Sequence, residues 1–250
     1  MRHTIRHLVP LALLGAAAIT PALAERPTPI AAALADRGRS EAHRKLDAER
    51  MPAEVLAFAG VRPDQVVVDF FAGEGYYSEL LADLVGPRGT VYLTNPPSFH
   101  DPKVVDPLLA RHPNVRTLVA PVAAMQFAPG SIDVLFTHLN YHDLYWQSEK
   151  FQYPRVEVPA VLADWFRAVK PGGHVVIVDH WGPPGDPRQV ADKLHRIDPE
   201  RVKADMTAAG FVLVGERNVL RRSEDDHTKL VFDPSVRGKS DRFMLKFQRP

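Results

Sequence analysis

The residues best suited to chemistry lie in a glycine-rich segment in the first half of the chain. Residues 66–77 read Val-Val-Val-Asp-Phe-Phe-Ala-Gly-Glu-Gly-Tyr-Tyr, the pattern of a buried strand, a glycine turn and the start of a helix. Gly73 and Gly75 let a ligand approach the backbone where no Cβ obstructs it, beside the partly positive helix N-terminus. The segment therefore predicts a site for a cofactor that contains an adenine nucleoside.

Two classes of such cofactor are compatible with the turn, and neighbouring residues separate them. Dinucleotide-binding enzymes need a third glycine, where this chain has Ser78, and an acid at the end of the second strand, where it has Asn95. Instead, Asp69 stands four residues before the first glycine. The order D-x-x-x-G-x-G disfavours a nicotinamide-dependent oxidoreductase and favours another adenosine-containing cofactor.

A second polar group follows the predicted fourth strand, as His138-Leu-Asn140-Tyr141-His142-Asp143. Ligands of open parallel sheets bind beyond the carboxyl ends of the strands, so we expect this segment to meet the ligand. His142 titrates near neutral pH and is a candidate general base, with Tyr141 and Asn140 as candidates to orient an acceptor. The alternative is that His142 only forms hydrogen bonds within a loop.

A metal site is a further interpretation of the same segment. If the chain is helical after the fourth strand, His138 and His142 share one face at i, i+4 spacing. Asp143, Asp179 or His180 then completes the ligand set. We expect no metal, because two nearby histidines are weak evidence for one.

Three other groups have more than one interpretation. Trp181 is the tryptophan that we most expect in the pocket, because it follows the fifth predicted strand. Asp198 before Pro199 predicts a helix cap, while His195 and Arg196 are candidates to face the pocket. The third group is in the long segment 220–241, where Asp225, Asp226 and His227 belong to a solvated turn or to a lid.

The elements that position these residues alternate between strand and helix. Strands are predicted at 65–70, 90–94, 115–119, 132–137, 174–178, 211–219 and 242–248, and helices at 52–59, 77–85, 158–169 and 198–209. This alternation predicts an α/β fold with a mostly parallel sheet, whose last two strands pair antiparallel at one edge. We expect one domain at 52–250, preceded at 25–51 by an exposed, charged helical lead-in.

From the Asp69 strand to its C-terminus, the chain resembles the class I S-adenosylmethionine-dependent methyltransferases. The landmarks are the glycine motif and the segments 127–136 and 170–177. Through residues 50–60, 194–199, 225–229 and 232–234 it also resembles a bacterial group of predicted methyltransferases that carry signal peptides. The resemblance implies a Rossmann-like, seven-stranded methyltransferase fold with an antiparallel edge strand.

The resemblance also implies S-adenosylmethionine as the cofactor, with Asp69 at its amino-acid end and Asn95 at its ribose. Such enzymes commonly place Asp or Glu at the ribose, so Asn95 is a departure from the pattern. The segment 120–124 also lacks the polar residue that often meets the adenine. The residues that we expect to bind the cofactor are Asp69, Ala72, Gly73, Gly75, Tyr76, Asn95 and His138.

Composition and the N-terminus restrict the partners and the compartment. The 250 residues include 31 Lys and Arg against 30 Asp and Glu and no cysteine, which excludes thiol chemistry and argues against a nucleic-acid footprint. Arg2 and Arg6, an apolar stretch at 8–20 and Ala22-Leu-Ala24 form a secretory signal pattern. We expect cleavage after Ala24 and a periplasmic or secreted protein without stable membrane insertion; the alternative is an uncleaved anchor.

These observations predict methylation of an oxygen or nitrogen on a small molecule, with S-adenosylmethionine as methyl donor. Asn95 and the export signal keep open a non-enzymatic ligand-binding protein on a degenerate methyltransferase fold. A metal-dependent hydrolase is a third possibility. The sequence names neither the methyl acceptor nor the oligomeric state.

Overall fold

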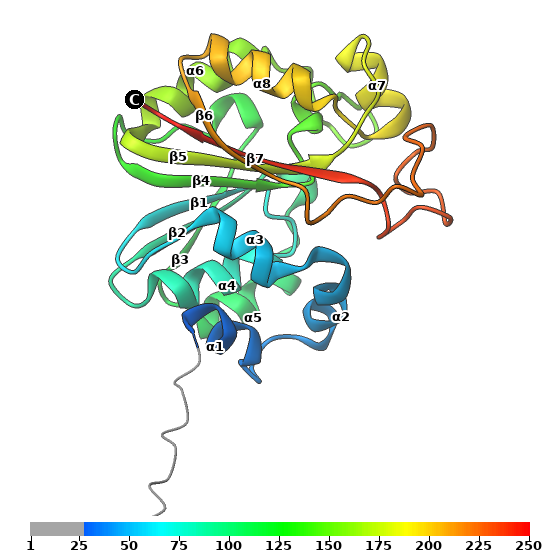
Figure 1. The fold of residues 1–250 in the computed structure, drawn as a ribbon. Helices are drawn as coiled ribbons and strands as arrows, with labels where there is room; N and C mark the ends of the chain where they lie inside the picture. The colour runs from blue at the N-terminus through cyan, green and yellow to red at the C-terminus, as the bar shows by residue number, and fades with distance from the viewer. Residues whose placement is uncertain (1–27) are drawn as a thin grey trace, which may run out of the picture.

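The computed structural model describes residues 28–250, so the predicted signal peptide lies outside the described residues. The chain forms one seven-stranded sheet with helices on both faces (Figure 1). The strand order across the sheet is β3-β2-β1-β4-β5-β7-β6. In chain order the strands are β1 (Val66–Phe70), β2 (Thr90–Asn95), β3 (Val115–Val119), β4 (Ile132–His138), β5 (Val169–His180), β6 (Val212–Arg217) and β7 (Arg242–Gln248).

The predicted architecture is confirmed. Strands β1 to β5 pair in parallel, and β7 pairs antiparallel with both β5 and β6. The antiparallel strand β7 lies inside the sheet, so β6 forms the edge. The strand order reverses between β1 and β4, which is the point of an open α/β sheet where ligands bind.

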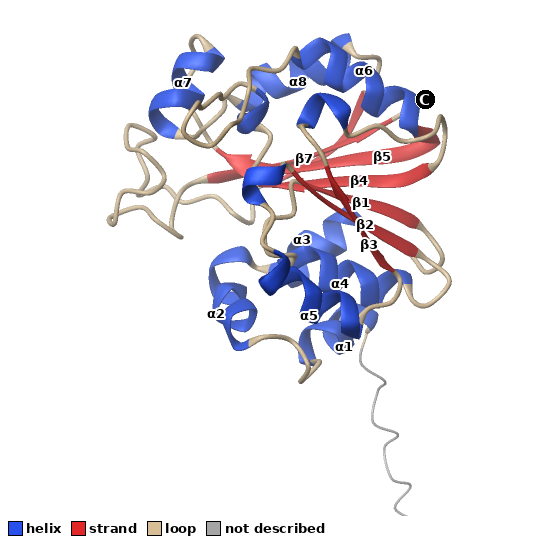
Figure 2. Cartoon of the chain, turned by 180° about the vertical axis from the view of Figure 1, so that it is seen from behind, coloured by secondary structure: helices blue, strands red, loops and turns tan. Residues whose placement is uncertain are grey.

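Helices cover the two faces in separate groups (Figures 1 and 2). Two apolar clusters follow from this arrangement: Trp165 and Met206 of α6 and α8 pack on one face, while Val55 and Leu80 of α3 and α4 pack on the other. The α-helices are α1 (Pro29–Ala35), α2 (Glu41–Arg50), α3 (Pro52–Ala59), α4 (Tyr76–Val85), α5 (Pro102–Arg111), α6 (Val158–Ala168), α7 (Pro187–Leu194) and α8 (Pro199–Ala208). The three short 3-10 helices are η1 (Pro97–Phe99), η2 (Val122–Ala124) and η3 (His142–Leu144).

Local signals explain where several of these helices begin and end. The Asp198 side chain accepts a hydrogen bond from the Glu200 backbone N–H, as the predicted cap of α8 requires. Gly60 ends α3 in the left-handed conformation. The helix predicted at 158–169 is α6, which ends at Ala168; the Pro171-Gly-Gly173 segment that follows lies within β5, which therefore begins earlier than the predicted strand at 174–178. Helices α5 and α7 were not expected from the sequence.

The segment 25–51 was expected to be an exposed, charged lead-in, and most side chains of its described part are exposed or half-buried, but Arg39 and His43 are buried. Arg39 is only 2% exposed. Its buried guanidinium is satisfied by hydrogen bonds to Asp47 at 2.7 and 2.8 Å and to Glu79 of α4 at 3.1 Å. His43 of α2 also contacts Glu79, at 2.9 Å. Burial acts to raise the pKa of Glu79, but His43 and Arg39 outweigh it and lower that pKa. These contacts hold α2 against α4.

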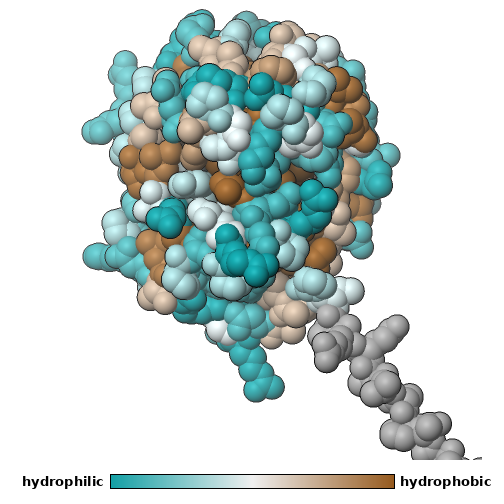
Figure 3. Space-filling model, turned by 90° about the vertical axis from the view of Figure 1, so that its left-hand side faces the viewer, coloured by the Kyte–Doolittle hydropathy of each residue, from teal (hydrophilic) through white to brown (hydrophobic). Residues whose placement is uncertain are grey.

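The molecular surface is mixed in hydropathy. On the side shown in Figure 3, hydrophilic side chains cover most of the surface and hydrophobic residues gather in separate patches. Among residues 28–250, no helix combines the length and the apolar character needed to cross a membrane.

Candidate functional site

A cavity of about 490 Å³ lies beyond the carboxyl ends of β1, β4 and β5. Its walls come from segments that are far apart in the chain: the glycine loop, the turn after β4, helix α2 and the segment between β6 and β7. The wall residues include seven of the predicted site residues, namely Asp69, Ala72, Gly73, Tyr76, His138, Asn140 and His142. The sequence therefore predicted the parts of the cavity wall that come from the glycine loop and from the segment at the end of β4.

Asp69 is the acidic group nearest the glycine loop. It lies near the end of β1, is 3% exposed, and accepts a hydrogen bond of 2.7 Å from the Ser78 hydroxyl. Burial raises the pKa of Asp69 to about 7, although Ser78 and the positive charge of Arg50 act in the opposite direction. A carboxylate held in this way gains strongly from a cationic ligand group.

The two glycines of the loop have different roles. Both have positive φ, +59° at Gly73 and +85° at Gly75. A Cβ at Gly73 would meet no atom within 4 Å, so the backbone there is open to a ligand. A Cβ at Gly75 would lie 2.7 Å from Leu108 of α5, and Gly75 does not line the cavity. Gly75 therefore allows close packing, and Gly73 forms the open surface.

Asn95 occupies a different position from the one expected. Its side chain is 0% exposed and does not line the cavity. The Oδ1 atom accepts from the Gly73 N–H at 2.8 Å, and the Nδ2 group donates to the Gly73 carbonyl at 2.8 Å. Because both polar groups hold the glycine loop, the structure makes Asn95 a positioning residue in place of the expected ribose ligand.

Tyr76 and His138 also line the cavity. The Tyr76 hydroxyl donates to Asp47 at 2.6 Å, and the Arg50 guanidinium lies 4.4 Å from the centre of the Tyr76 ring. The Nε2 atom of His138 is buried and has no hydrogen-bond partner among the described residues. Burial, together with the charges of Arg50 and Arg242, lowers the pKa of His138 well below its usual value, so its imidazole is neutral.

The turn after β4 joins His142 to a buried carboxylate. The His142 backbone N–H donates to Asp179 at 2.7 Å, and its Nδ1 lies 2.9 Å from the same carboxylate. Burial acts to lower the pKa of His142, but Asp179 and Asp143 outweigh it and raise that pKa to about 9. His142 is therefore protonated at neutral pH in the ligand-free protein, which argues against its expected role as general base there.

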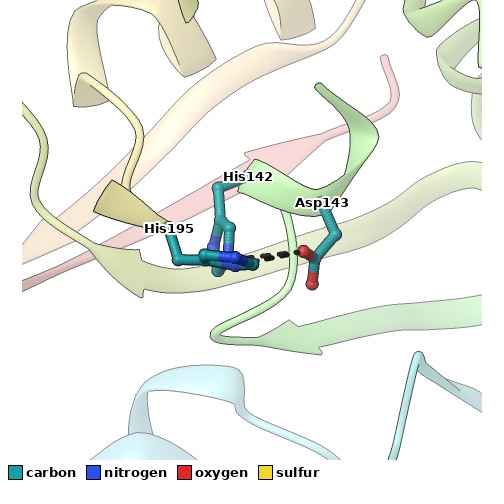
Figure 4. A group of neighbouring side chains, drawn as sticks. All are labelled: His142, Asp143 and His195. Atoms are coloured by element: carbon teal, nitrogen blue, oxygen red, sulfur yellow. Dashed lines mark ion pairs between the residues drawn. The ribbon is translucent and has the colours of Figure 1, made fainter. Parts of the chain in front are cut away.

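Asp143 and His195 complete a cluster with His142 (Figure 4). The Oδ1 atom of Asp143 lies 3.5 Å from His142 Nε2 and 3.8 Å from His195 Nδ1. Burial raises the pKa of Asp143 to about 6, with Asp179 acting in the same direction. Burial and the charge of His142 lower the pKa of His195 to about 4. From the sequence, His195 was a candidate to face the pocket. It lies in the turn between α7 and α8, and only the fold brings it next to His142 and Asp143.

Two residues of the polar segment have structural roles that the sequence did not separate from catalytic ones. Tyr141 is 0% exposed, lies outside the cavity wall, and donates to Asp205 of α8 at 3.2 Å, which argues against its expected contact with an acceptor. Asn140 does line the cavity, while its Nδ2 donates to the backbone carbonyls of Phe71 and His138 at 2.5 and 3.0 Å.

The chain after β4 is not an α-helix. Leu139 has φ of +64°, and only the short 3-10 helix η3 follows. His138 and His142 consequently do not share a helix face, and the His138 ring packs 4.7 Å from that of Tyr77. The i, i+4 pairing of these histidines is therefore not present.

The segment 220–241 is exposed along most of its length, as at Asp226, but it is anchored to the domain at a buried carboxylate. Asp225 is 5% exposed and accepts two hydrogen bonds, of 2.8 and 3.0 Å, from the fully buried Arg196. Phe232 from the same segment lines the cavity. Trp181 does not; Trp146 does, which corrects the expectation for the tryptophans.

Comparison with known proteins supports the fold. No protein-family model matches the chain, and no curated protein matches it. Many solved structures are similar, and three of them match along most of their length: a SAM-dependent methyltransferase from Aquifex aeolicus (19% identity, TM-score 0.57, 84% of this chain and 97% of that chain), one from Mesorhizobium loti (14%, 0.57, 82% and 100%), and geranyl diphosphate C-methyltransferase from Streptomyces coelicolor (18%, 0.58, 88% and 84%). The chain therefore has the Rossmann-like fold of the class I SAM-dependent methyltransferases.

Proposed function

We propose that this protein transfers the methyl group of S-adenosylmethionine to an oxygen or nitrogen of a small molecule. The observation that carries the proposal is that one cavity contains both the Asp69 and Gly73 surface and the His142, Asp143 and His195 cluster. The volume of about 490 Å³ lies within the usual range for small-molecule sites. The similar structures add support, since those from Aquifex aeolicus and Mesorhizobium loti are SAM-dependent methyltransferases.

The residues present fit this cofactor. Its amino-acid end carries an ammonium group that complements the Asp69 carboxylate and a carboxylate that complements Arg50, and both residues line the cavity. The open space at Gly73 lets the cofactor lie close to the backbone, and the unpartnered Nε2 of His138 adds a polar contact in the same cavity. When bound, S-adenosylmethionine supplies an electrophilic methyl group.

Methyl transfer is an in-line displacement, so the protein contributes mainly by holding the two reactants in line. Asp69 and the glycine loop hold the donor side, while His142 and Asn140 lie on the side left for the acceptor. Below pH 9 the protonated His142 donates a hydrogen bond to the acceptor, and above pH 9 it can remove a proton.

The acceptor is expected to have an apolar part. Phe71, Phe99, Trp146, Phe151 and Phe232 all line the cavity. Phe99 lies 5.0 Å from Phe71 and 5.7 Å from Phe151, measured between ring centres, which forms a continuous aromatic wall. Such a wall favours an aromatic or branched apolar molecule over a sugar or a free amino acid.

A turnover assay tests the proposal. The protein is incubated with S-adenosylmethionine and a panel of phenols, catechols and aromatic amines, and S-adenosylhomocysteine release is measured. We expect acceptor-dependent release that Asp69→Asn and His142→Gln reduce, with His112→Gln, a buried histidine outside the cavity, as control.

The second candidate function is cofactor-type ligand binding without turnover. It is favoured by Asn95, which is committed to the glycine loop and leaves no acid at the end of β2. This alternative gives S-adenosylmethionine binding with no S-adenosylhomocysteine release on any acceptor, and His142→Gln then leaves the binding unchanged.

We also propose export from the cytoplasm. The support is the basic, apolar and small-residue pattern of residues 1–24. Cell fractionation of the tagged chain, with and without residues 2–24, tests it: export predicts a shortened product outside the cytoplasm only when the segment is present.

A further inference from the structure

We propose that His142, Asp143 and His195 bind one divalent transition-metal ion in the wall of the cavity. The two imidazoles and the carboxylate each direct one ligand atom into the same space, and these atoms lie within 4.8 Å of one another (Figure 4). The proposal does not depend on methyl transfer, because it concerns only the ion and its ligands. The ion takes the place of the proton on His142 Nε2, so in the metal-bound protein the ion, and no longer the His142 N–H, faces the acceptor.

The distances within the cluster are close to those that an ion requires. Metal bonds to His nitrogen and carboxylate oxygen are about 2.0–2.2 Å long, which places neighbouring ligand atoms roughly 3–3.5 Å apart. His142 Nε2 and His195 Nδ1 lie 3.5 and 3.8 Å from Asp143 Oδ1. Rotamer adjustments of a few tenths of an ångström therefore bring these pairs to coordination distance.

The cluster also has the second layer of contacts that ordered metal sites have. The Asp179 carboxylate is 0% exposed and accepts from both the backbone N–H and Nδ1 of His142. This contact fixes the imidazole so that Nε2 faces Asp143 and the cavity. A carboxylate that holds one nitrogen of a histidine while the other binds metal is a common arrangement, and it strengthens the ligand.

Burial separates this cluster from an ordinary group of surface charges. His142 and Asp143 are 3% and 8% exposed, and the His195 ring packs 5.2 Å from Trp146 and 5.0 Å from Phe232, measured between ring centres. A carboxylate and two imidazoles held together in apolar surroundings are stabilised by a shared cation.

The ligand atoms determine which metal ions fit the site and which groups of a bound molecule can complete the coordination. Two nitrogens and one oxygen suit zinc, iron(II), cobalt or nickel, whereas magnesium and calcium prefer oxygen ligands. Three protein ligands leave at least one coordination position open. All three residues line the cavity, so that position faces the molecule bound there, and a hydroxyl, phenol or carboxylate group fits it.

Metal titrations without S-adenosylmethionine test the site. Protein stripped with chelator is titrated with Zn²⁺ by calorimetry and with Co²⁺ by visible absorption. We expect one ion per chain, and at least a tenfold loss of affinity in His195→Gln, Asp143→Asn and Asp179→Asn. The matched control is His112→Gln, which removes a buried histidine 3.5 Å from Asp83 outside the cavity and should leave affinity unchanged.

Three results would overturn the proposal. They are no saturable binding by folded wild-type protein, unchanged affinity in the His195→Gln and Asp143→Asn variants, and equal losses in those variants and His112→Gln. Circular dichroism of each variant confirms that it is folded before titration. A failure of methyl transfer with one bound ion would refute the proposed function and leave the metal site intact.

Discussion

Replacing Asp69 with Asn is expected to stabilise the protein while weakening cofactor binding. The buried carboxyl has its pKa raised from 3.8 to about 7. Each pKa unit corresponds to about 1.4 kcal/mol, so the ionised carboxylate costs the folded protein about 4 kcal/mol at pH 7 and above. Asn keeps the shape of Asp and can accept from the Ser78 hydroxyl, so we expect the variant to recover about 2–4 kcal/mol at pH 8.

The sign of the effect fixes its pH dependence. A carboxyl whose pKa is raised by folding destabilises the native state as pH rises from the unfolded value of 3.8 to the folded value of about 7. The stabilisation by Asn should therefore be largest above pH 7 and fall below about 2 kcal/mol at pH 5. Urea denaturation of both proteins at pH 5 and pH 8 measures this difference.

The same substitution removes the partner of the cofactor ammonium group. A hydrogen bond to a charged group contributes about 1.5–3 kcal/mol, so affinity for S-adenosylmethionine should fall about 10- to 150-fold in calorimetry. Asp179→Asn is the control, because Asp179 accepts hydrogen bonds from His142 and His180, and its loss should destabilise the protein. Lower stability of Asp69→Asn at pH 8, or unchanged affinity, would refute the reasoning.

Three further predictions concern the titration of Asp69, the packing of the two loop glycines and the buried Arg39–Glu79 ion pair. Affinity for S-adenosylmethionine should rise about fivefold between pH 6 and pH 7 as Asp69 ionises with its pKa of about 7, and level off above about pH 8; a flat calorimetric profile contradicts this. Gly75→Ala should lower the free energy of unfolding by about 2–4 kcal/mol, since its Cβ meets Leu108 at 2.7 Å, whereas Gly73→Ala should cost only about 1–2 kcal/mol; equal urea midpoints would exclude the packing role. Glu79→Gln leaves buried Arg39 with one anionic partner fewer and should destabilise the protein by about 2–4 kcal/mol, and thermal unfolding at unchanged midpoint would contradict the ion-pair argument.

The sheet was predictable because its strands have strong local signals. The apolar, β-branched run at residues 66–68 and the Asp198 cap before Pro199 each specify an element without help from distant residues. Helix α5 was missed because prolines at positions 102 and 107 obscure its periodicity. Pro-Gly-Gly at 171–173 indicates a turn locally, yet β5 pairs with β4 at Val169 and again from His174, where pairing with β7 also begins. These contacts on both sides include the segment in β5.

The site was only partly predictable, because long-range contacts decide which side chains face the cavity. Leu139 turns the chain with a positive φ, which sends Tyr141 towards Asp205 and His142 towards Asp179. No pattern in the segment 138–143 distinguishes these directions. Arg50 and Phe232 reach the same cavity from opposite ends of the chain, and only the folded structure brings them together.

Calorimetry of the chain from Glu25 to Pro250 with S-adenosylmethionine and S-adenosylhomocysteine tests the central claim most directly. The account predicts one binding site per chain with micromolar affinity for both molecules, because Asp69, Arg50 and the Gly73 backbone line one cavity. Absence of binding by a sample with a cooperative unfolding transition would contradict the assignment of this cavity to the cofactor.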